Sequence, residues 1–134
     1  MFKLIKILNS GVNVPEPCRI SKAPDTVLKA GTAIAVSEGL AVNCTATQAP
    51  DYITLAKAGE SEESVLCYKV FPDMLFEVEA SQSPASLNVG DKVTLGIDSD
   101  GAACSVTATL ASGVAYVYSL DGATAAGQKI TVKF

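Results

Sequence analysis

The sequence contains neither histidine nor tryptophan in its 134 residues. Histidine is the usual general base, proton shuttle and metal ligand near neutral pH, so its absence leaves a hydrolytic triad without a base. The four cysteines form no C-x-x-C pair, and no histidine could complete a mixed zinc site. Serines are plentiful, but no G-x-S-x-G elbow holds one of them. We therefore expect a protein that is not an enzyme and that carries no metal or cofactor.

Long apolar runs are also missing, because no stretch approaches the roughly 20 residues that a membrane-spanning helix requires. The N-terminus does not read as a signal peptide, since Lys6 interrupts a short apolar run and no convincing cleavage site follows at 9–11. We expect no membrane association and free cysteines in a reducing compartment. In an exported protein, two disulfides in one of three pairings would become possible among Cys18, Cys44, Cys67 and Cys104.

Charge is unevenly distributed along a chain whose net charge is −4. Residues 1–29 hold five basic and two acidic side chains, whereas residues 30–134 hold five lysines and twelve acids. An acidic body argues against a nucleic-acid partner, which normally meets a basic face. The basic N-terminal segment indicates either an arm that docks on an acidic neighbour or a strand whose lysines are solvated.

Two segments approach known ligand motifs without matching them. Residues 122–129 nearly match a phosphate-binding loop, but Gln128 stands where the lysine belongs and a strand, not a helix, follows. Residues 98–101 are similar to the start of a calcium loop, but Gly96 and Thr107 occupy the first and twelfth ligand positions. We interpret both segments as turns.

Alternation of apolar and polar residues with period two predicts three strands near the C-terminus, at 92–97, 114–120 and 128–134. Glycine and aspartate between them supply turns that tolerate positive φ. In the second strand the two tyrosines, Tyr116 and Tyr118, share a face with apolar residues, so we expect them in the core. We expect the last strand to close the sheet.

The rest of the body has the same character. Further short strands are predicted at 27–31, 32–36, 40–47, 52–56, 65–70 and 74–79. No helical periodicity intervenes, which favours an all-β protein with a small antiparallel sandwich or barrel-like body over residues 25–134. Residues 81–86 suggest a hinge between possible sub-lobes at 25–80 and 87–134.

Residues 1–24 differ in composition from the body. Residues 2–8 are compatible with a strand or with one helical turn, because seven residues do not decide the period. The sequence 14–17 contains two prolines, which fix φ and remove amide donors, as in a semi-rigid linker. Fully extended, this N-terminal arm could reach roughly 70–80 Å and embrace a neighbouring subunit. We predict that its partner contacts are Phe2, Lys3, Leu4, Lys6, Pro15, Pro17, Arg19 and Lys22.

The body resembles the capsid decoration (cement, or auxiliary head) proteins of tailed bacteriophages. The resemblance lies in the order of five segments and in a chain that ends on a strand: 27–33, 52–56, 71–78, 89–93 and 114–134. It implies a small β-rich protein that binds the outer surface of a capsid lattice and stiffens it against internal DNA pressure. It also implies the major capsid protein as partner, engaged by the N-terminal segment, and a homo-oligomer, most often a trimer.

A second interpretation is a surface-displayed β module that binds glycans or a host. Such a module needs exposed aromatic side chains in a groove, and the candidates are Tyr52, Tyr68, Tyr116 and Tyr118. On the first interpretation the chain is expected at the outer capsid surface of the virion, after assembly in the cytoplasm of a bacterial host.

Overall fold

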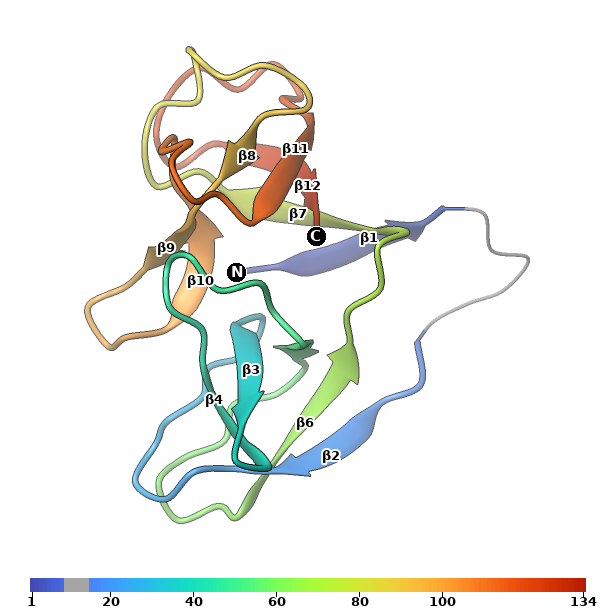
Figure 1. The fold of residues 1–134 in the computed structure, drawn as a ribbon, viewed down its shortest axis with the longest axis vertical. Helices are drawn as coiled ribbons and strands as arrows, with labels where there is room; N and C mark the ends of the chain where they lie inside the picture. The colour runs from blue at the N-terminus through green and yellow to red at the C-terminus, as the bar shows by residue number, and fades with distance from the viewer. Residues whose placement is uncertain (9–14) are drawn as a thin grey trace.

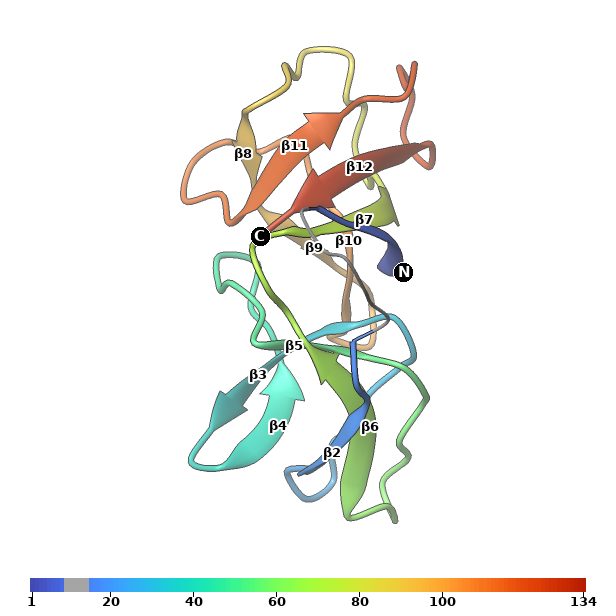
Figure 2. The same cartoon turned by 90° about the vertical axis from the view of Figure 1, so that its right-hand side faces the viewer.

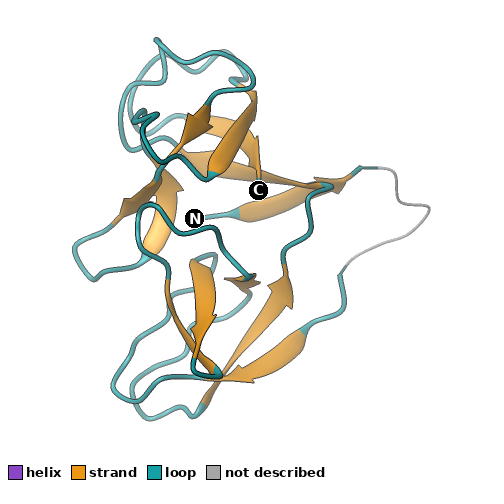
Figure 3. Cartoon of the chain, viewed as in Figure 1, coloured by secondary structure: helices purple, strands orange, loops and turns teal. Residues whose placement is uncertain are grey.

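The structure, a computed structural model, describes residues 1–8 and 15–134, and these residues hold twelve strands and no helix (Figure 3). The strands form two sheets of five and seven strands in which every ladder is antiparallel. Neither sheet closes into a barrel, and the arrangement is compatible with a sandwich. The predicted all-β, antiparallel fold class is confirmed.

The five-stranded sheet occupies the upper part of Figure 1. Its strands, in spatial order, are β1 (Lys3–Ile7), β7 (Met74–Glu79), β12 (Lys129–Lys133), β11 (Ala115–Ser119) and β8 (Lys92–Val93). The last strand of the chain, β12, therefore lies at the centre of the sheet, between β7 and β11. Our expectation that it closes the sheet is wrong, because β1 and β7 extend the sheet beyond it.

Most of the seven-stranded sheet occupies the lower part of Figure 1, and its strands β9 and β10 lie at mid-height on the left. Its order is β2 (Cys18–Ser21), β6 (Ser64–Lys69), β5 (Tyr52–Thr54), β3 (Ala33–Ser37), β10 (Ala103–Val106) and β9 (Leu95–Ile97), with β4 (Leu40–Asn43) also paired to β3. The strand predicted at 92–97 is divided at Thr94 between the two sheets. Each sheet therefore contains strands from both of the segments 25–80 and 87–134.

The main core lies where the two sheets meet (Figures 1 and 2). Phe76 and Ile130 come from the five-stranded sheet and Ala33 and Ile53 from the other, and all four are fully buried. A second, smaller cluster of buried apolar side chains, which includes Leu28, packs against the seven-stranded sheet. The main core is shared by both sheets, and a chain of this size can bury about two-thirds of its unfolded surface.

Residues 1–24 lie within the body as far as the structure describes them. Residues 2–8 contain a strand and not a helical turn, because β1 pairs with β7, and Phe2 is only 2 % exposed. Further on, β2 pairs with β6. The two ends of the segment are thus held by different sheets, and residues 9–14 lie outside the described part.

The face of β11 that packs into the core is the opposite of the face that we predicted. Ala115 and Val117 are fully buried, whereas Tyr116 is half-buried and Tyr118 is 43 % exposed. Our prediction of core tyrosines is therefore wrong. The small side chains fit the interior beside β12, and the register shifts between Val117 and Ser119, which places Tyr118 at the irregularity.

Candidate interaction surface

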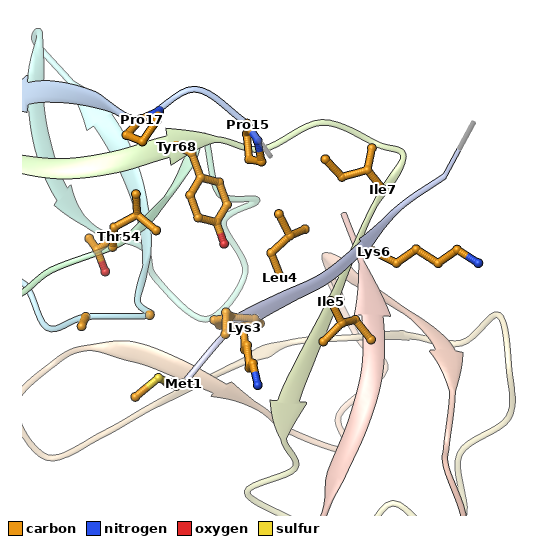
Figure 4. A pocket seen from close by; sticks show the side chains of 14 residues that line it. Met1, Lys3, Leu4, Ile5, Lys6, Ile7, Pro15, Pro17, Thr54 and Tyr68 are labelled. Atoms are coloured by element: carbon orange, nitrogen blue, oxygen red, sulfur yellow. The ribbon is translucent and has the colours of Figure 1, made fainter. Parts of the chain in front are cut away.

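A groove of about 670 Å³ lies beside β1 (Figure 4). The strand forms one wall, and the segment containing Pro15 and Pro17 forms another. Residues of the seven-stranded sheet and its loops complete the lining: Ala30, Gly31, Thr54, Leu55 and Tyr68. The groove is therefore a feature of both sheets together and is built around the N-terminal segment.

The local irregularity of β1 decides which side chains enter this groove. The register against β7 shifts between Leu4 and Lys6, so that Leu4 opposes Phe76 and Ile7 opposes Met74. A β-bulge inserts one extra residue into a strand, so that two side chains three positions apart point to the same side of the sheet. Leu4 and Ile7 consequently point to the same side, toward Tyr68, as Figure 4 shows.

The outer edge of β1 is partly tied to the lower sheet. The Phe2 N–H donates to the Gly31 carbonyl over 2.8 Å, and the Tyr68 hydroxyl is hydrogen-bonded to the backbone of Leu4. Burial raises the pKa of Tyr68 to about 12, and the hydrogen bond to Leu4 acts in the opposite direction. The hydroxyl is thus neutral at physiological pH.

Six of the eight predicted contact residues line this one groove, namely Phe2, Lys3, Leu4, Lys6, Pro15 and Pro17. Arg19 and Lys22 do not, because they lie on and just after β2. Lys22 is 5 % exposed and donates to the carbonyls of Ala23 and Thr26, so its charge serves the fold. Phe2 is likewise taken up by the core. Lys3, Lys6 and Arg19 are the predicted cationic contacts that remain exposed.

The outer face of the five-stranded sheet adjoins the groove and carries further lysines. Tyr116 of β11 pairs with Lys133 of β12 on one side and with Lys92 of β8 on the other. The Lys92 ammonium lies 4.6 Å from the centroid of the Tyr116 ring, a cation–π distance. Lys3 and Lys6 of β1 belong to the same sheet but are separated from this row by β7, which carries Glu77 opposite Lys3.

The charges of this face are only partly compensated. Lys129 forms an ion pair with Glu77 over 2.8 Å, and this contact lowers the pKa of the carboxyl below its ordinary value. Among residues 1–8 and 15–134, no ion pair within 4.0 Å involves Lys3, Lys6, Lys92 or Lys133. The face is thus locally basic on a chain whose net charge is −4.

Residues 1–8 and 15–134 contain no group of three or more histidine, cysteine, aspartate or glutamate side chains arranged to hold a metal ion. In the same residues there is no helix of the length and hydrophobicity needed to cross a membrane.

The predicted contact residues that line the groove all come from the N-terminal segment, and the lining residues from the rest of the chain were not predicted. The lining residues Gly31, Thr54 and Tyr68 lie far along the chain from β1, and no local pattern connects them with it. The basic row across the sheet was missed for the same reason, since it is created by strand order and register.

No protein-family model matches the chain, and no curated protein sequence is significantly similar to it. Its fold is similar to that of a solved structure, the N base of the head fiber protein gp8.5 of bacteriophage phi29. The TM-score is 0.55 at 18 % sequence identity, and the correspondence covers 89 % of this chain and 94 % of the other. At this identity the similarity establishes a shared fold.

Proposed function

We propose that this chain is a non-enzymatic structural protein of a phage virion that binds the outer surface of the capsid lattice and stabilises it. The observation that carries the proposal is the similarity in fold to a phage head fiber base over nearly the whole of both chains. The resemblance of the sequence to capsid decoration proteins points to the same part of a virion. Fold alone does not determine function, so the proposal rests on both.

The groove and the lysines of β1 are the proposed docking surface for the major capsid protein. The groove offers an apolar interior, with Leu4 and Ile7 facing Tyr68, beside the exposed cations Lys3 and Lys6. Apolar anchors supply affinity, whereas rim charges speed association and select an acidic partner surface. This keeps the predicted role of the N-terminal segment but assigns it to a strand of the folded body.

Lattice reinforcement requires contact area and not a reaction. A standard interface removes roughly 800 Å² from each partner, which is about one ninth of the 6824 Å² surface of this chain. Many weak contacts on one shell add up through multivalency. We propose in addition that the chain acts as a homo-oligomer, with a trimer favoured, because the resemblance implies one.

Charge reversal on β1 tests the docking surface better than truncation would. Deleting residues 1–22 removes both β1 and β2, so a loss of binding would not distinguish docking from unfolding. The double variant Lys3→Glu/Lys6→Glu changes only exposed side chains. We expect it to bind bare capsids about tenfold more weakly or worse in co-sedimentation, with a reduced dependence on salt.

The matched control is Lys57→Glu/Lys69→Glu, which makes the same change in net charge at exposed positions outside the groove. This control should bind capsids as the unmodified chain does. Equal weakening by both double variants would show a general charge effect and would contradict docking through β1. Failure of the unmodified chain to bind any capsid of its own phage would contradict the proposed function itself.

The exposed tyrosine of β11 supports a second candidate function, a glycan-binding or host-binding module on the virion surface. Tyr118 is 43 % exposed. Tyr116, on the same strand, lies beneath the ammonium group of Lys92 from the neighbouring strand β8. Exposed aromatic rings are the usual platforms for sugar rings. A glycan array separates the two candidates, since specific binding that is lost in Tyr118→Ala would favour the second.

A further inference from the structure

Two cysteines stand directly opposite each other across a strand pair. Cys18 of β2 is the register partner of Cys67 of β6, and their sulfur atoms lie 3.8 Å apart. The Cys67 thiol also approaches the Cys18 carbonyl at 3.7 Å. Because 48 residues separate them in the sequence, no local sequence pattern predicts this pairing.

The geometry satisfies the requirements of a disulfide. Directly opposed residues of an antiparallel ladder have Cα atoms about 4.5–5.5 Å apart, within the range of about 4.4–6.8 Å that disulfides span. The sulfur atoms need to approach by about 1.8 Å to reach a bond length near 2.05 Å. Rotation of the two side chains can supply such a movement without a change in strand register.

The two thiols differ in access to solvent. Cys18 is exposed at the edge of the sheet, because β2 is its outermost strand, whereas Cys67 is fully buried. Burial, followed by the neighbouring Cys18 thiol, raises the pKa of Cys67. An oxidant in solution therefore reaches Cys18 first, and Cys67 is the partner that reacts from the interior.

We propose that Cys18 and Cys67 form an intramolecular disulfide when the chain passes from a reducing to an oxidising medium. With glutathione disulfide as oxidant, the Cys18 thiolate attacks one sulfur of it, forming a mixed disulfide and releasing one glutathione. Cys67 then loses its proton and attacks the Cys18 sulfur, releasing the second glutathione. Two protein thiols are oxidised by two electrons, and one glutathione disulfide is reduced to two glutathiones.

The bond would fasten the edge strand β2 to β6 and enclose the chain from 18 to 67. Closing a loop of this length removes entropy from the unfolded ensemble and so stabilises the fold. This inference goes beyond the proposed function and does not depend on it. If the chain is a virion protein, the bond forms after lysis, when the particle leaves the reducing cytoplasm.

Peptide mapping of the full-length chain tests the proposal. Each of the four cysteines falls in a separate tryptic peptide, with Cys18 in residues 7–19 and Cys67 in residues 58–69. After equilibration in buffers of increasing glutathione disulfide content, we expect a cross-linked peptide joining these two, with the loss of two thiols. The oxidised chain should melt on the order of 10 °C above the reduced one.

Cys18→Ser is the diagnostic variant because the side chain is exposed and the change leaves the core intact. Cys104→Ser, at a half-buried position away from β2, is the matched control. The control should form the cross-link and gain the same thermal shift, and the Cys18 variant should do neither. Persistence of four free thiols in an excess of oxidant, a stable glutathione adduct at Cys18 or a cross-link to another cysteine would each overturn the proposal.

Discussion

Phe2 is a buried core residue, although the residues around it in the sequence do not indicate this. Its ring lies 5.6 Å from that of Phe134 and 6.4 Å from that of Phe76, in an edge-to-face arrangement with the latter. The second and the last residues of the chain therefore meet inside the core. A residue predicted as a partner contact is in fact part of the packing that joins the two ends of the chain.

Removing this ring should destabilise the whole fold. We expect Phe2→Ala to lower the free energy of unfolding by about 3–5 kcal/mol, the range for truncating a buried phenylalanine. Urea titration measures the change. On the same strand Ile5 is 49 % exposed, so Ile5→Ala should cost less than about 1 kcal/mol. Similar losses for both variants would contradict the burial of Phe2.

Gly113 is required because the backbone of β8 packs too closely for a Cβ atom, and not because of its φ. A Cβ atom there would come within 2.6 Å of the Val93 nitrogen and closer still to the Lys92 carbonyl. We expect Gly113→Ala to separate β8 from β11 and to cost about 1–3 kcal/mol by overpacking. Thermal melting provides the measurement, with Gly59→Ala as the control, since its nearest atom would lie 3.7 Å away. A stable Gly113→Ala variant would show that the loop yields.

At the scale of the element, β12 was predicted correctly in its alternation and wrongly in its position. Ile130 and Val132 are fully buried, as the period of two requires. Its place between β7 and β11 depends on pairing with β7, whose residues lie 50 and more positions earlier in the sequence, and alternation cannot reveal such a partner. Thr131 on the opposite face is also buried, at 6 % exposure, as suits a central strand.

A charge in this central strand should prevent folding. Val132→Asp would bury an unpaired carboxylate, and the cost should approach the roughly 5–15 kcal/mol that stabilise an ordinary domain. We expect the variant to lack the near-UV circular dichroism of the native chain. The adjacent Lys133→Asp places the same carboxylate on the outer face and should fold. A folded Val132→Asp variant would contradict the register of β12.

Two strands, β10 and β2, were absent from the sequence prediction because neither shows the local pattern of a strand. In β10, Ala103 and Val106 are buried while Cys104 and Ser105 between them are not, so strict alternation is missing. The ladder of this strand with β9 contains a register shift after Ala103. The other strand, β2, is short and follows two prolines, which read as a linker. Pairing partners, and not local pattern, make these segments strands.

At the scale of the whole molecule, Lys29 links segments about 70 residues apart. Its ammonium group forms ion pairs with Asp98 over 2.7 Å and with Asp100 over 2.6 Å. Hydrogen bonding from Lys29, and then from the Ala102 N–H, lowers the pKa of Asp98 below its ordinary value of 3.8. The contact therefore favours the folded state above that value and is lost as the pH falls through the lowered pKa.

The stability of a Lys29 variant should depend on pH accordingly. Lys29→Met should melt below the unmodified chain at pH 7, and the difference should shrink as the pH falls below 3.8 and through the lowered pKa of Asp98. Melting curves across this range measure the effect. Lys57→Met, at an exposed lysine in a loop, should show no difference at either pH. A gap for Lys29→Met that persists in acid would mean that its packing, and not its charge, matters.

The secondary structure class, most of the strands and the turns between them could be predicted from the amino-acid sequence alone. Alternation, turn chemistry and the absence of helical periodicity are local properties, and the left-handed backbone at Gly101, Asp121 and Gly122 confirms the turns predicted from glycine and aspartate. Six of the eight N-terminal residues that we predicted as partner contacts line the groove, whereas Arg19 and Lys22 do not. Whether those residues and the wider groove bind a capsid remains a prediction.

Only the tertiary structure decided what those residues meet. Strand order placed β12 in the centre, brought Phe2 to Phe134, and set Cys18 opposite Cys67. It also showed that the tyrosines of β11 face outward, because an alternating strand has two faces and only its neighbours choose which one is buried. Pairing between distant segments follows from the packing of the entire chain, and for that reason no local pattern could have supplied it.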